Sequence, residues 1–277
     1  MPSLVGSEMC IRDSYIAEWM SGYLDGTGAA GFVVGVSGGI DSAVVSTLAA
    51  MTGRRTLCVT LPIHQVQAQV DRAGEHVRRL TERYSNAEAA HADLTAAYDA
   101  FAGSFAPSLV QGAGKGVADL AGANARSRLR MTALYYFAGL NNLLVVGTGN
   151  KIEDFGVGFF TKYGDGGVDI SPIADLTKTE VYELGRWLGV PEAILAAPPT
   201  DGLFGDDRTD EQQIGATYPE LERAMAHAER GTDPALLSGR EREVYDIFLR
   251  RNRANRHKME PIPVCRIPRH LVEPAGR

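Results

Sequence analysis

Gly35-Val36-Ser37-Gly38-Gly39-Ile40-Asp41-Ser42 stands at the end of an apolar run, residues 32–36, and opens a segment rich in alanine, valine and leucine. The run has the length and composition of a buried parallel strand, and residues 41–51 predict a helix. Two adjacent glycines permit unusual backbone dihedrals and a close approach between main chain and ligand. Backbone N–H groups in such a turn, together with the positive end of the following helix, attract anions, and Ser37 and Ser42 add hydroxyl donors. The stretch therefore predicts a phosphate-binding turn between a strand and its helix.

Asp41 places a negative charge where phosphates are expected to bind. A carboxylate facing bound phosphates would repel them unless a cation lay between, so Asp41 is a candidate magnesium ligand. The alternative is that the glycines only form a tight turn and Asp41 caps the helix, but the complete string after an apolar strand favours the phosphate site. The string has neither the lysine of a Walker loop nor the Gly-x-Gly-x-x-Gly spacing, which argues against kinases and dehydrogenases.

The pattern on either side of this stretch predicts alternating strands and helices. Apolar runs at 32–36, 56–61 and 143–147 predict strands, and helical periodicity is present at 15–24, 41–51, 66–84, 117–140 and 240–255. A capping box, Thr177-Lys178-Thr179-Glu180, opens a further helix that ends at Gly189, while residues 103–116 and 198–215 have loop composition. The order predicts a single α/β domain with an open, mostly parallel, Rossmann-like sheet and helices on both faces.

Composition excludes several classes of protein. A net charge of −6 argues against a broad basic face, so no nucleic-acid partner is expected. The three cysteines, Cys10, Cys58 and Cys265, are too far apart in the chain to suggest a zinc site or disulfide framework, which favours a reducing compartment and a cytoplasmic location. No apolar run approaches the length of a membrane span, so no membrane association is expected.

The first fourteen residues, MPSLVGSEMCIRDS, fit neither a signal peptide nor a helix or strand that continues into the chain. We interpret residues 1–14 as a non-native or disordered segment, of foreign origin, and residues 15–277 as the functional domain. Mass spectrometry of the protein from its native source tests this interpretation.

The stretch at residues 35–42 resembles the Ser-Gly-Gly-x-Asp-Ser motif of the PP-loop ATP pyrophosphatases, which activate an oxygen by adenylation. The resemblance implies an adenine nucleotide alpha hydrolase-like fold and ATP as a cosubstrate, held by the whole stretch from Gly35 to Ser42. A second stretch, residues 147–180, reads GTGNKIEDFGVGFFTKYGDGGVDISPIADLTKTE. It resembles the signature region of the NAD synthetases, and that resemblance extends over roughly residues 15–265.

The resemblance implies roles for particular residues. Glu153, just beyond a strand end where open α/β sheets bind ligands, would form a two-carboxylate magnesium site with Asp41; a solvated loop carboxylate is its alternative. Residues that match the family's ATP contacts are Thr148, Lys178 and Thr200. Residues that match its deamido-NAD contacts are Arg128, Lys162, Asp169, His257 and Lys258. Asp41, Glu153 and Lys178 are the expected catalytic residues.

Some features of the sequence leave alternatives open. On composition alone both lysines, Lys162 and Lys178, would be solvated surface residues, and Arg126 and Arg130 are expected as surface or interface charges. The acidic loop 201–211 either closes over bound substrates or is merely disordered. The spacing from Glu153 to Lys162 is one residue longer than in the commonest bacterial pattern, which leaves the shape of that loop open.

The expected reaction is the last step of NAD biosynthesis. The nicotinate carboxylate of deamido-NAD attacks the α-phosphorus of ATP, and magnesium-bound pyrophosphate departs. Ammonia then displaces AMP from the acyl adenylate and gives NAD. The resemblance implies a homodimer, and it favours ammonia over glutamine because 277 residues leave no room for a fused glutaminase domain. The alternatives are another PP-loop amidating or thiolating enzyme and a non-catalytic nucleotide-binding module.

Overall fold

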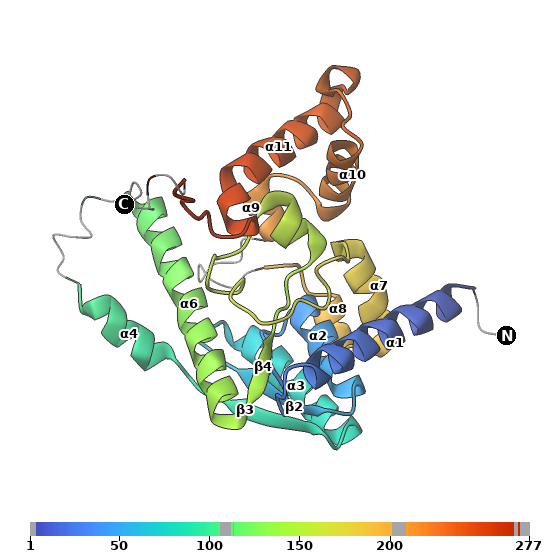
Figure 1. Ribbon diagram of the computed structural model, residues 1–277, viewed down its shortest axis with the longest axis vertical. Coiled ribbons are helices and arrows are strands. Elements are labelled where there is room, and N and C mark those ends of the chain that lie inside the picture. The colour runs from blue at the N-terminus through green and yellow to red at the C-terminus, as the bar shows by residue number, and fades with distance from the viewer. Residues whose placement is uncertain (1–3, 106–111, 113, 201–208, 269–270, 272–277) are drawn as a thin grey trace, which may run out of the picture.

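The computed structural model describes residues 4–105, 112, 114–200, 209–268 and 271, with side chains of the first helix described from Met9 onward. Within these ranges four strands form one parallel sheet in the order β3-β2-β1-β4 (Figure 1). The strands are β1 (Gly31–Gly35), β2 (Arg55–Thr60), β3 (Ala87–His91) and β4 (Leu143–Val146).

Helices connect and follow the strands. The first half of the chain contains α1 (Leu4–Asp25), α2 (Ile40–Met51), α3 (Gln67–Arg83), α4 (Thr95–Gly103) and α6 (Lys115–Asn141). The second half contains the π-helix η1 (Ile152–Val157), α7 (Lys178–Leu188), α8 (Glu192–Leu195), α9 (Asp210–Ile214), α10 (Tyr218–Glu229), the 3₁₀ turn η2 (Pro234–Leu236) and α11 (Gly239–Met259). No helix among the described residues combines the length and apolar character that a bilayer crossing requires.

The two faces of the sheet are covered by different helices because successive side chains of a strand point to opposite sides. Phe32 and Val34 of β1 pack with α1, α2 and α7, and Cys58, the register partner of Val34, packs against α3. Val33 and Val145 point the other way and pack against α6. The prediction of a parallel α/β sheet with helices on both faces is confirmed.

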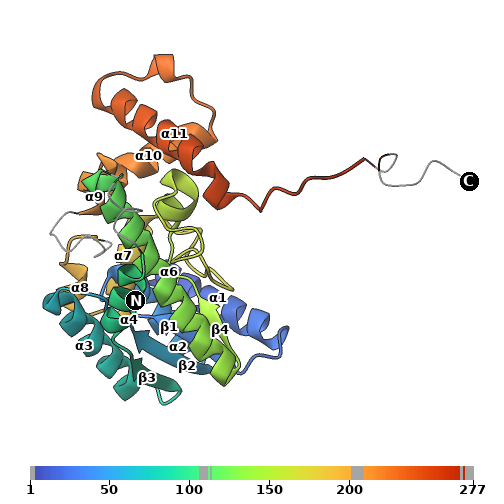
Figure 2. The ribbon, with the colours of Figure 1, turned by 90° about the vertical axis from the view of Figure 1, so that its left-hand side faces the viewer.

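A second apolar cluster lies beyond the sheet. It joins η1, α9, α10 and α11 through buried side chains that include Ile152, Leu221 and Phe248. Figure 1 shows α10 and α11 side by side at one end of the molecule, away from the strands. Figure 2 shows residues 260–268 running from the end of α11 away from the body of the protein.

The structure corrects the prediction for the start of the chain. The first helix begins at Leu4, not near Tyr15, so the expectation that residues 4–14 continue no helix is wrong. Met9 and Asp13 are buried, and Trp187 donates a hydrogen bond from Nε1 to Asp13 Oδ2 at 2.8 Å. Whether residues 1–14 are foreign stays a prediction.

Some elements were not expected from the sequence. The sequence-based predictions did not include strand β3, helix α4 or helix α10, and α9 lies inside the predicted loop 198–215. β3 is one of the two edge strands of the sheet, and most of its residues are partly or fully exposed, so its sequence lacks the apolar run of an inner strand. Residues 106–111, 113 and 201–208 of the two predicted loops lie outside the described residues.

Candidate active site

The phosphate-binding turn lies where β1 ends and α2 begins. Ser42 Oγ accepts a hydrogen bond from the Ser37 backbone N–H at 3.2 Å and donates to Gly39 O at 3.0 Å, which closes the turn onto the helix. Gly38 has a φ of +85°, and a Cβ at this position would lie 2.5 Å from the carbonyl oxygen of Gln69. A glycine is therefore required here for two reasons, the left-handed backbone and the contact with α3.

Asp41 does not cap this helix, contrary to the simpler alternative. The N-cap residue is Gly39, and no side chain makes a capping hydrogen bond there. Asp41 is directed instead to Asn150, whose Nδ2 donates to Asp41 Oδ1 at 3.2 Å, and to Lys178. The N-terminus of α2 consequently keeps its partial positive charge for a ligand.

A cavity of about 290 Å³ opens over the turn. All eight residues from Gly35 to Ser42 line it. Four further predicted residues line the same cavity, namely Thr148, Glu153, Lys178 and Thr200. The structure thus brings together every residue predicted to contact ATP, from segments up to 165 positions apart in the chain (35 to 200).

Three charged side chains meet at the edge of this cavity, and we call Asp41, Glu153 and Lys178 the charged triad. Lys178 Nζ lies 2.6 Å from Asp41 Oδ2 and 2.8 Å from Glu153 Oε1. Asp41 belongs to the first turn of α2, Glu153 to η1, and Lys178 is the first residue of α7, whose predicted capping box is present. Lys178 is 3% exposed, so the alternative of a solvated surface lysine is wrong.

Burial and pairing determine the charge of the triad. Burial lowers the pKa of Lys178, but the two carboxylates raise it by more, so the net pKa is raised and the ammonium stays charged. Burial raises the pKa of Asp41, and its pairing with Lys178 only partly offsets this. Burial also raises the pKa of Glu153, but the attraction of Lys178 and hydrogen bonds that include one from Tyr218 lower it by more, so the net pKa is lowered.

The residues present fit a magnesium ion. Two carboxylates already converge on one cationic group, the Lys178 ammonium, which shows that both can reach a single positive charge. Magnesium is commonly held by one or two carboxylates together with substrate phosphates, rather than by a full protein cage. In the described part of the chain no group of three or more His, Cys, Asp and Glu side chains could hold a metal ion.

The predicted deamido-NAD residues lie elsewhere, and none belongs to the described lining of this cavity. Arg128 Nε donates to Lys162 O at 3.2 Å, and Lys162 Nζ donates to the carbonyl oxygen of His257. Lys258 Nζ donates to the carbonyl oxygens of Gly158 and Phe160, both at 2.8 Å. These contacts bring the end of α11, the middle of α6 and the loop after η1 together.

Asp169, the fifth residue predicted to contact deamido-NAD, lies in a different environment from the other four predicted residues. Its carboxylate accepts a hydrogen bond from Tyr135 at 2.9 Å and another from the Val145 backbone N–H at 2.8 Å. It is therefore attached to β4 and to the adjacent face of α6. Its predicted contact with deamido-NAD stays a prediction.

Three residues of the site, Arg130, Asn150 and Tyr218, were not predicted from the sequence. Arg130 was expected as a surface or interface charge, but it lines the cavity and donates to Leu61 O and Gln65 Oε1, both at 2.8 Å. Asn150 is fully buried, and its Oδ1 accepts hydrogen bonds from the first residues of η1, including Glu153 N at 3.1 Å. Tyr218 donates to Glu153 from a helix 65 residues away. Asn150 stands three positions before Glu153, so the sequence could have indicated that it belongs to the site. No local pattern in the sequence indicates a role for Tyr218.

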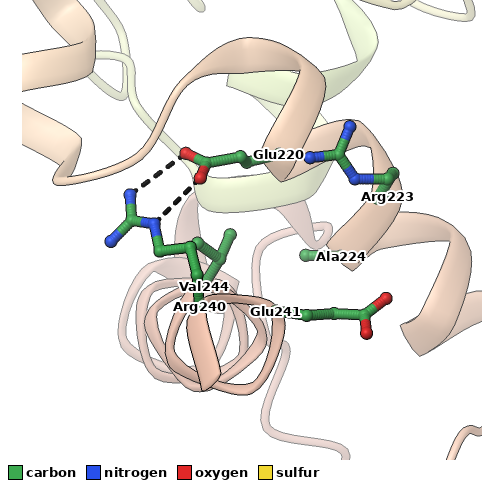
Figure 3. Close-up of a pocket in the computed structure, with 6 residues that line it drawn as sticks. All are labelled: Glu220, Arg223, Ala224, Arg240, Glu241 and Val244. Carbon is green, nitrogen blue, oxygen red and sulfur yellow. Dashed lines mark hydrogen bonds and ion pairs between the residues drawn. The ribbon is translucent and has the colours of Figure 1, made fainter. Parts of the chain in front are cut away.

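A smaller pocket of about 150 Å³ lies between α10 and α11 (Figure 3). Arg240 donates from Nε to Glu220 Oε1 at 2.8 Å and from a terminal nitrogen to Oε2 at 3.0 Å, so both oxygens of this carboxylate are engaged. The other side chains drawn there are Arg223, Ala224, Glu241 and Val244. The ion pair between Arg240 and Glu220 links α11 to α10 beside this pocket, and no residue of the charged triad lines it.

Comparison with known proteins identifies the family. The family model of NAD synthase matches residues 13–262. The ammonia-dependent NAD synthetase of Syntrophomonas wolfei is 39% identical over 258 residues, which cover 93% of this chain and 96% of the relative. The corresponding protein of Archaeoglobus fulgidus is 36% identical over 256 residues, covering 91% and 95% of the two chains.

Solved structures agree with this result. The NMN synthetase of Francisella tularensis superposes with a TM-score of 0.80 at 32% identity, over 94% of this chain and 99% of that one. The ammonia-dependent NAD synthetase of Campylobacter jejuni, at 22% identity and a TM-score of 0.73, has the same fold. From the extent of these matches, the chain belongs to the NAD synthase family.

Proposed function

We propose that this chain is a ligase that amidates deamido-NAD with ammonia, using ATP and releasing AMP and pyrophosphate. Family membership supports the reaction class, and curated relatives of nearly equal length bear the name ammonia-dependent NAD synthetase. The observation that carries the proposal is the convergence of Asp41, Glu153 and Lys178 beside the phosphate-binding turn.

The proposed chemistry uses position and charge, without a covalent nucleophile from the protein. A carboxylate oxygen of the nicotinate forms a bond to the α-phosphorus, and the bond from that phosphorus to pyrophosphate breaks. Ammonia then forms a bond to the acyl carbon, AMP leaves, and the nitrogen loses a proton to give the amide. The backbone N–H groups of the turn and the Lys178 ammonium bind and orient the phosphates.

Magnesium is part of the proposal because the fold offers two carboxylates beside the phosphates. Asp41 and Glu153 would hold it, and when bound it supplies neutralisation of phosphate charge. In the same proposal, Arg128, Lys162, Asp169, His257 and Lys258 hold deamido-NAD. Homodimer formation and a cytoplasmic location stay predictions.

The alternatives have less support. Thiolating enzymes generally need catalytic or cluster-binding cysteines, but Cys10, Cys58 and Cys265 lie far apart in the chain, and burial raises the pKa of the Cys58 thiol to about 12. A non-catalytic nucleotide-binding module would have no reason to keep a buried, charged triad, because such a group is costly to desolvate. One specific observation favours a second substrate: the neighbour from Francisella tularensis is an NMN synthetase. Nicotinate mononucleotide, which presents the same carboxylate, is therefore the second candidate.

The direct test is product formation by the purified chain. NAD, AMP and pyrophosphate should appear in equal amounts from deamido-NAD, ATP, magnesium and ammonium, and nicotinate mononucleotide should be assayed in parallel. Amidation of the mononucleotide alone would transfer the assignment to the second candidate, and no amide from either substrate would refute the proposal.

Replacing the metal-binding carboxylate tests the mechanism. Asp41→Asn should lower pyrophosphate release about 100-fold or more, because a carboxylate oxygen is lost from the magnesium site. Circular dichroism should remain unchanged, since Lys178 keeps its pairing with Glu153. Pyrophosphate release near the wild-type rate would remove Asp41 from the proposed site.

A further inference from the structure

Tyr218 joins the outer helices to the charged triad. It is the first residue of α10, it is 3% exposed, and the capping box of Thr217 and Glu220 fixes the start of its helix. Its backbone N–H donates to Glu211 Oε1 of α9 at 2.9 Å. The backbone of Tyr218 is thus fixed by α10 and by α9, and its side chain extends from there to the active site.

The phenol contacts both the carboxylate and the lysine of the site. Its hydroxyl donates to Glu153 Oε1, and Lys178 Nζ lies 4.9 Å from the ring centroid. Lys178 donates to the same oxygen, Oε1. The two hydrogen bonds from Tyr218 and Lys178 restrict rotation of the Glu153 carboxylate. Neither donor forms a hydrogen bond with Glu153 Oε2.

The phenol has no plausible role as an acid or base. Burial first, and then the nearby carboxylates of Glu153 and Asp210, raise the pKa of Tyr218 far above its ordinary value. The hydroxyl therefore stays protonated and donates its proton in the hydrogen bond to Glu153. Its second neighbour, Asp210 Oδ2, lies at 3.3 Å, farther than Glu153.

We propose that Tyr218 is a positioning residue, which fixes the orientation of Glu153 for the divalent cation that accompanies ATP and so connects α9–α11 to the phosphate site. The inference rests on the proposed function, because that function supplies the cation. A hydroxyl that only filled space would leave cation binding unaffected.

The experiment compares two buried tyrosines of the same apolar cluster. Tyr218→Phe removes the hydroxyl that meets Glu153, and the control Tyr245→Phe removes one that donates to Thr232 O at 3.2 Å. Binding of Mn²⁺ is measured by electron paramagnetic resonance in the presence of a non-hydrolysable ATP analogue. Half-saturation of NAD formation by Mg²⁺ is measured alongside.

Tyr218→Phe should weaken Mn²⁺ binding about tenfold and raise the half-saturating Mg²⁺ concentration by a similar factor, as loss of a group that hydrogen-bonds a metal ligand does. Tyr245→Phe should stay within about twofold of the wild type for both quantities. Unchanged Mn²⁺ binding in Tyr218→Phe, or an equal loss in both variants, would overturn the proposal. Mn²⁺ binding needs no turnover, so a wild type that makes no NAD would count against the proposed function alone.

A double-variant cycle distinguishes an effect of Tyr218 that acts through Glu153 from a general structural defect, because a structural defect weakens Mn²⁺ binding equally with and without the Glu153 carboxylate. Glu153→Gln removes the charge that Tyr218 contacts, and Tyr218→Phe should then weaken Mn²⁺ binding no further. Additive losses in the double variant would show that Tyr218 acts independently of Glu153, which would refute the positioning role.

Discussion

Gly38 stands at the centre of the phosphate-binding turn, and its replacement tests the geometry of the turn at the scale of one residue. Gly38→Ala places a methyl group 2.5 Å from Gln69 O and 3.1 Å from Ala73 N, both backbone atoms that cannot rotate away. Gly53 has a similar φ of +70° but open space around it. A comparison of Gly38→Ala with Gly53→Ala therefore separates the free-energy cost of a left-handed backbone from the free-energy cost of the contact with α3.

We predict that Gly53→Ala lowers the free energy of unfolding by about 1 kcal/mol, the cost of a left-handed alanine. Gly38→Ala should lower it by a further 1–3 kcal/mol, roughly the cost of overpacking, and should also weaken ATP binding. Urea denaturation and calorimetric titration with ATP measure the two effects. Equal losses of stability in both variants would mean that α3 moves aside freely.

The three residues of the charged triad differ in how well the sequence alone predicts their place in the site. Asp41 was expected from its place after Gly38 and Gly39, because a carboxylate beside a phosphate turn needs a cation. Lys178 lies 137 positions farther along the chain, and no local property distinguishes it from a surface lysine. Only the similarity of its surrounding string suggested a role, and burial to 3% exposure is a property of the fold.

At the scale of elements, the loop after β4 contains a π-helix, Ile152–Val157. A π-helical turn closes its hydrogen bonds over one residue more than an α-helical turn does, and such turns are frequent at functional sites. The resemblance to the family predicts one additional residue between Glu153 and Lys162 relative to the commonest bacterial pattern, and the π-helix overlaps that interval. The wider turn of the π-helix can accommodate one extra residue, and the Glu153 carboxylate still accepts a hydrogen bond from Lys178.

The packing of α3 against α2 leads to a prediction of pH dependence. His76 of α3 is 2% exposed, and its Nε2 lies 2.9 Å from Ser46 Oγ of α2. Burial, with a smaller contribution from Arg79, lowers the pKa of His76 from 6.5 to about 4, although a hydrogen bond to the Ala43 backbone opposes the shift. The unfolded chain therefore binds a proton more readily than the folded chain between these two values.

Stability from His76 should be complete above pH 6.5 and should fall as the pH drops from 6.5 towards 4. The pKa difference corresponds to about 3 kcal/mol in total, of which about 2 kcal/mol should be lost by pH 5. Urea denaturation of the wild type and of His76→Gln at pH 7.5 and pH 5 measures it, since glutamine can bond Ser46 without titrating. If both proteins lose the same stability, His76 does not titrate as described.

At the scale of the whole molecule, two apolar clusters meet at the active site. One lies between the sheet and its helices, and the other holds α9, α10 and α11 together. Glu153 belongs to an element of the second cluster, whereas Asp41 and Lys178 belong to helices packed on the sheet. A ligand that engages all three should therefore stabilise both parts of the protein together.

We predict that ATP with magnesium raises the melting temperature by about 5 °C or more at 100 times its dissociation constant, where binding contributes about 2.7 kcal/mol. Removal of magnesium with EDTA should reduce this shift, and Asp41→Asn should show no magnesium-dependent part. Differential scanning calorimetry measures all three conditions. A shift in Asp41→Asn that still depends fully on magnesium would contradict the assignment of the metal site.

The sequence by itself determined the parallel α/β class, the turn between strand and helix at residues 35–42, the capping box of α7 and the family, because each depends on neighbouring residues or on a local string. Tertiary structure alone decided which distant side chains meet: Lys178 between two carboxylates, Arg130 in the cavity wall and Tyr218 on Glu153. It also decided the edge strand β3 and the helix at residues 4–14, since neither has an apolar pattern that is complete without its neighbours. Local patterns fix local conformation, whereas contacts over tens of residues depend on how helices pack on a sheet, which no short window of sequence contains.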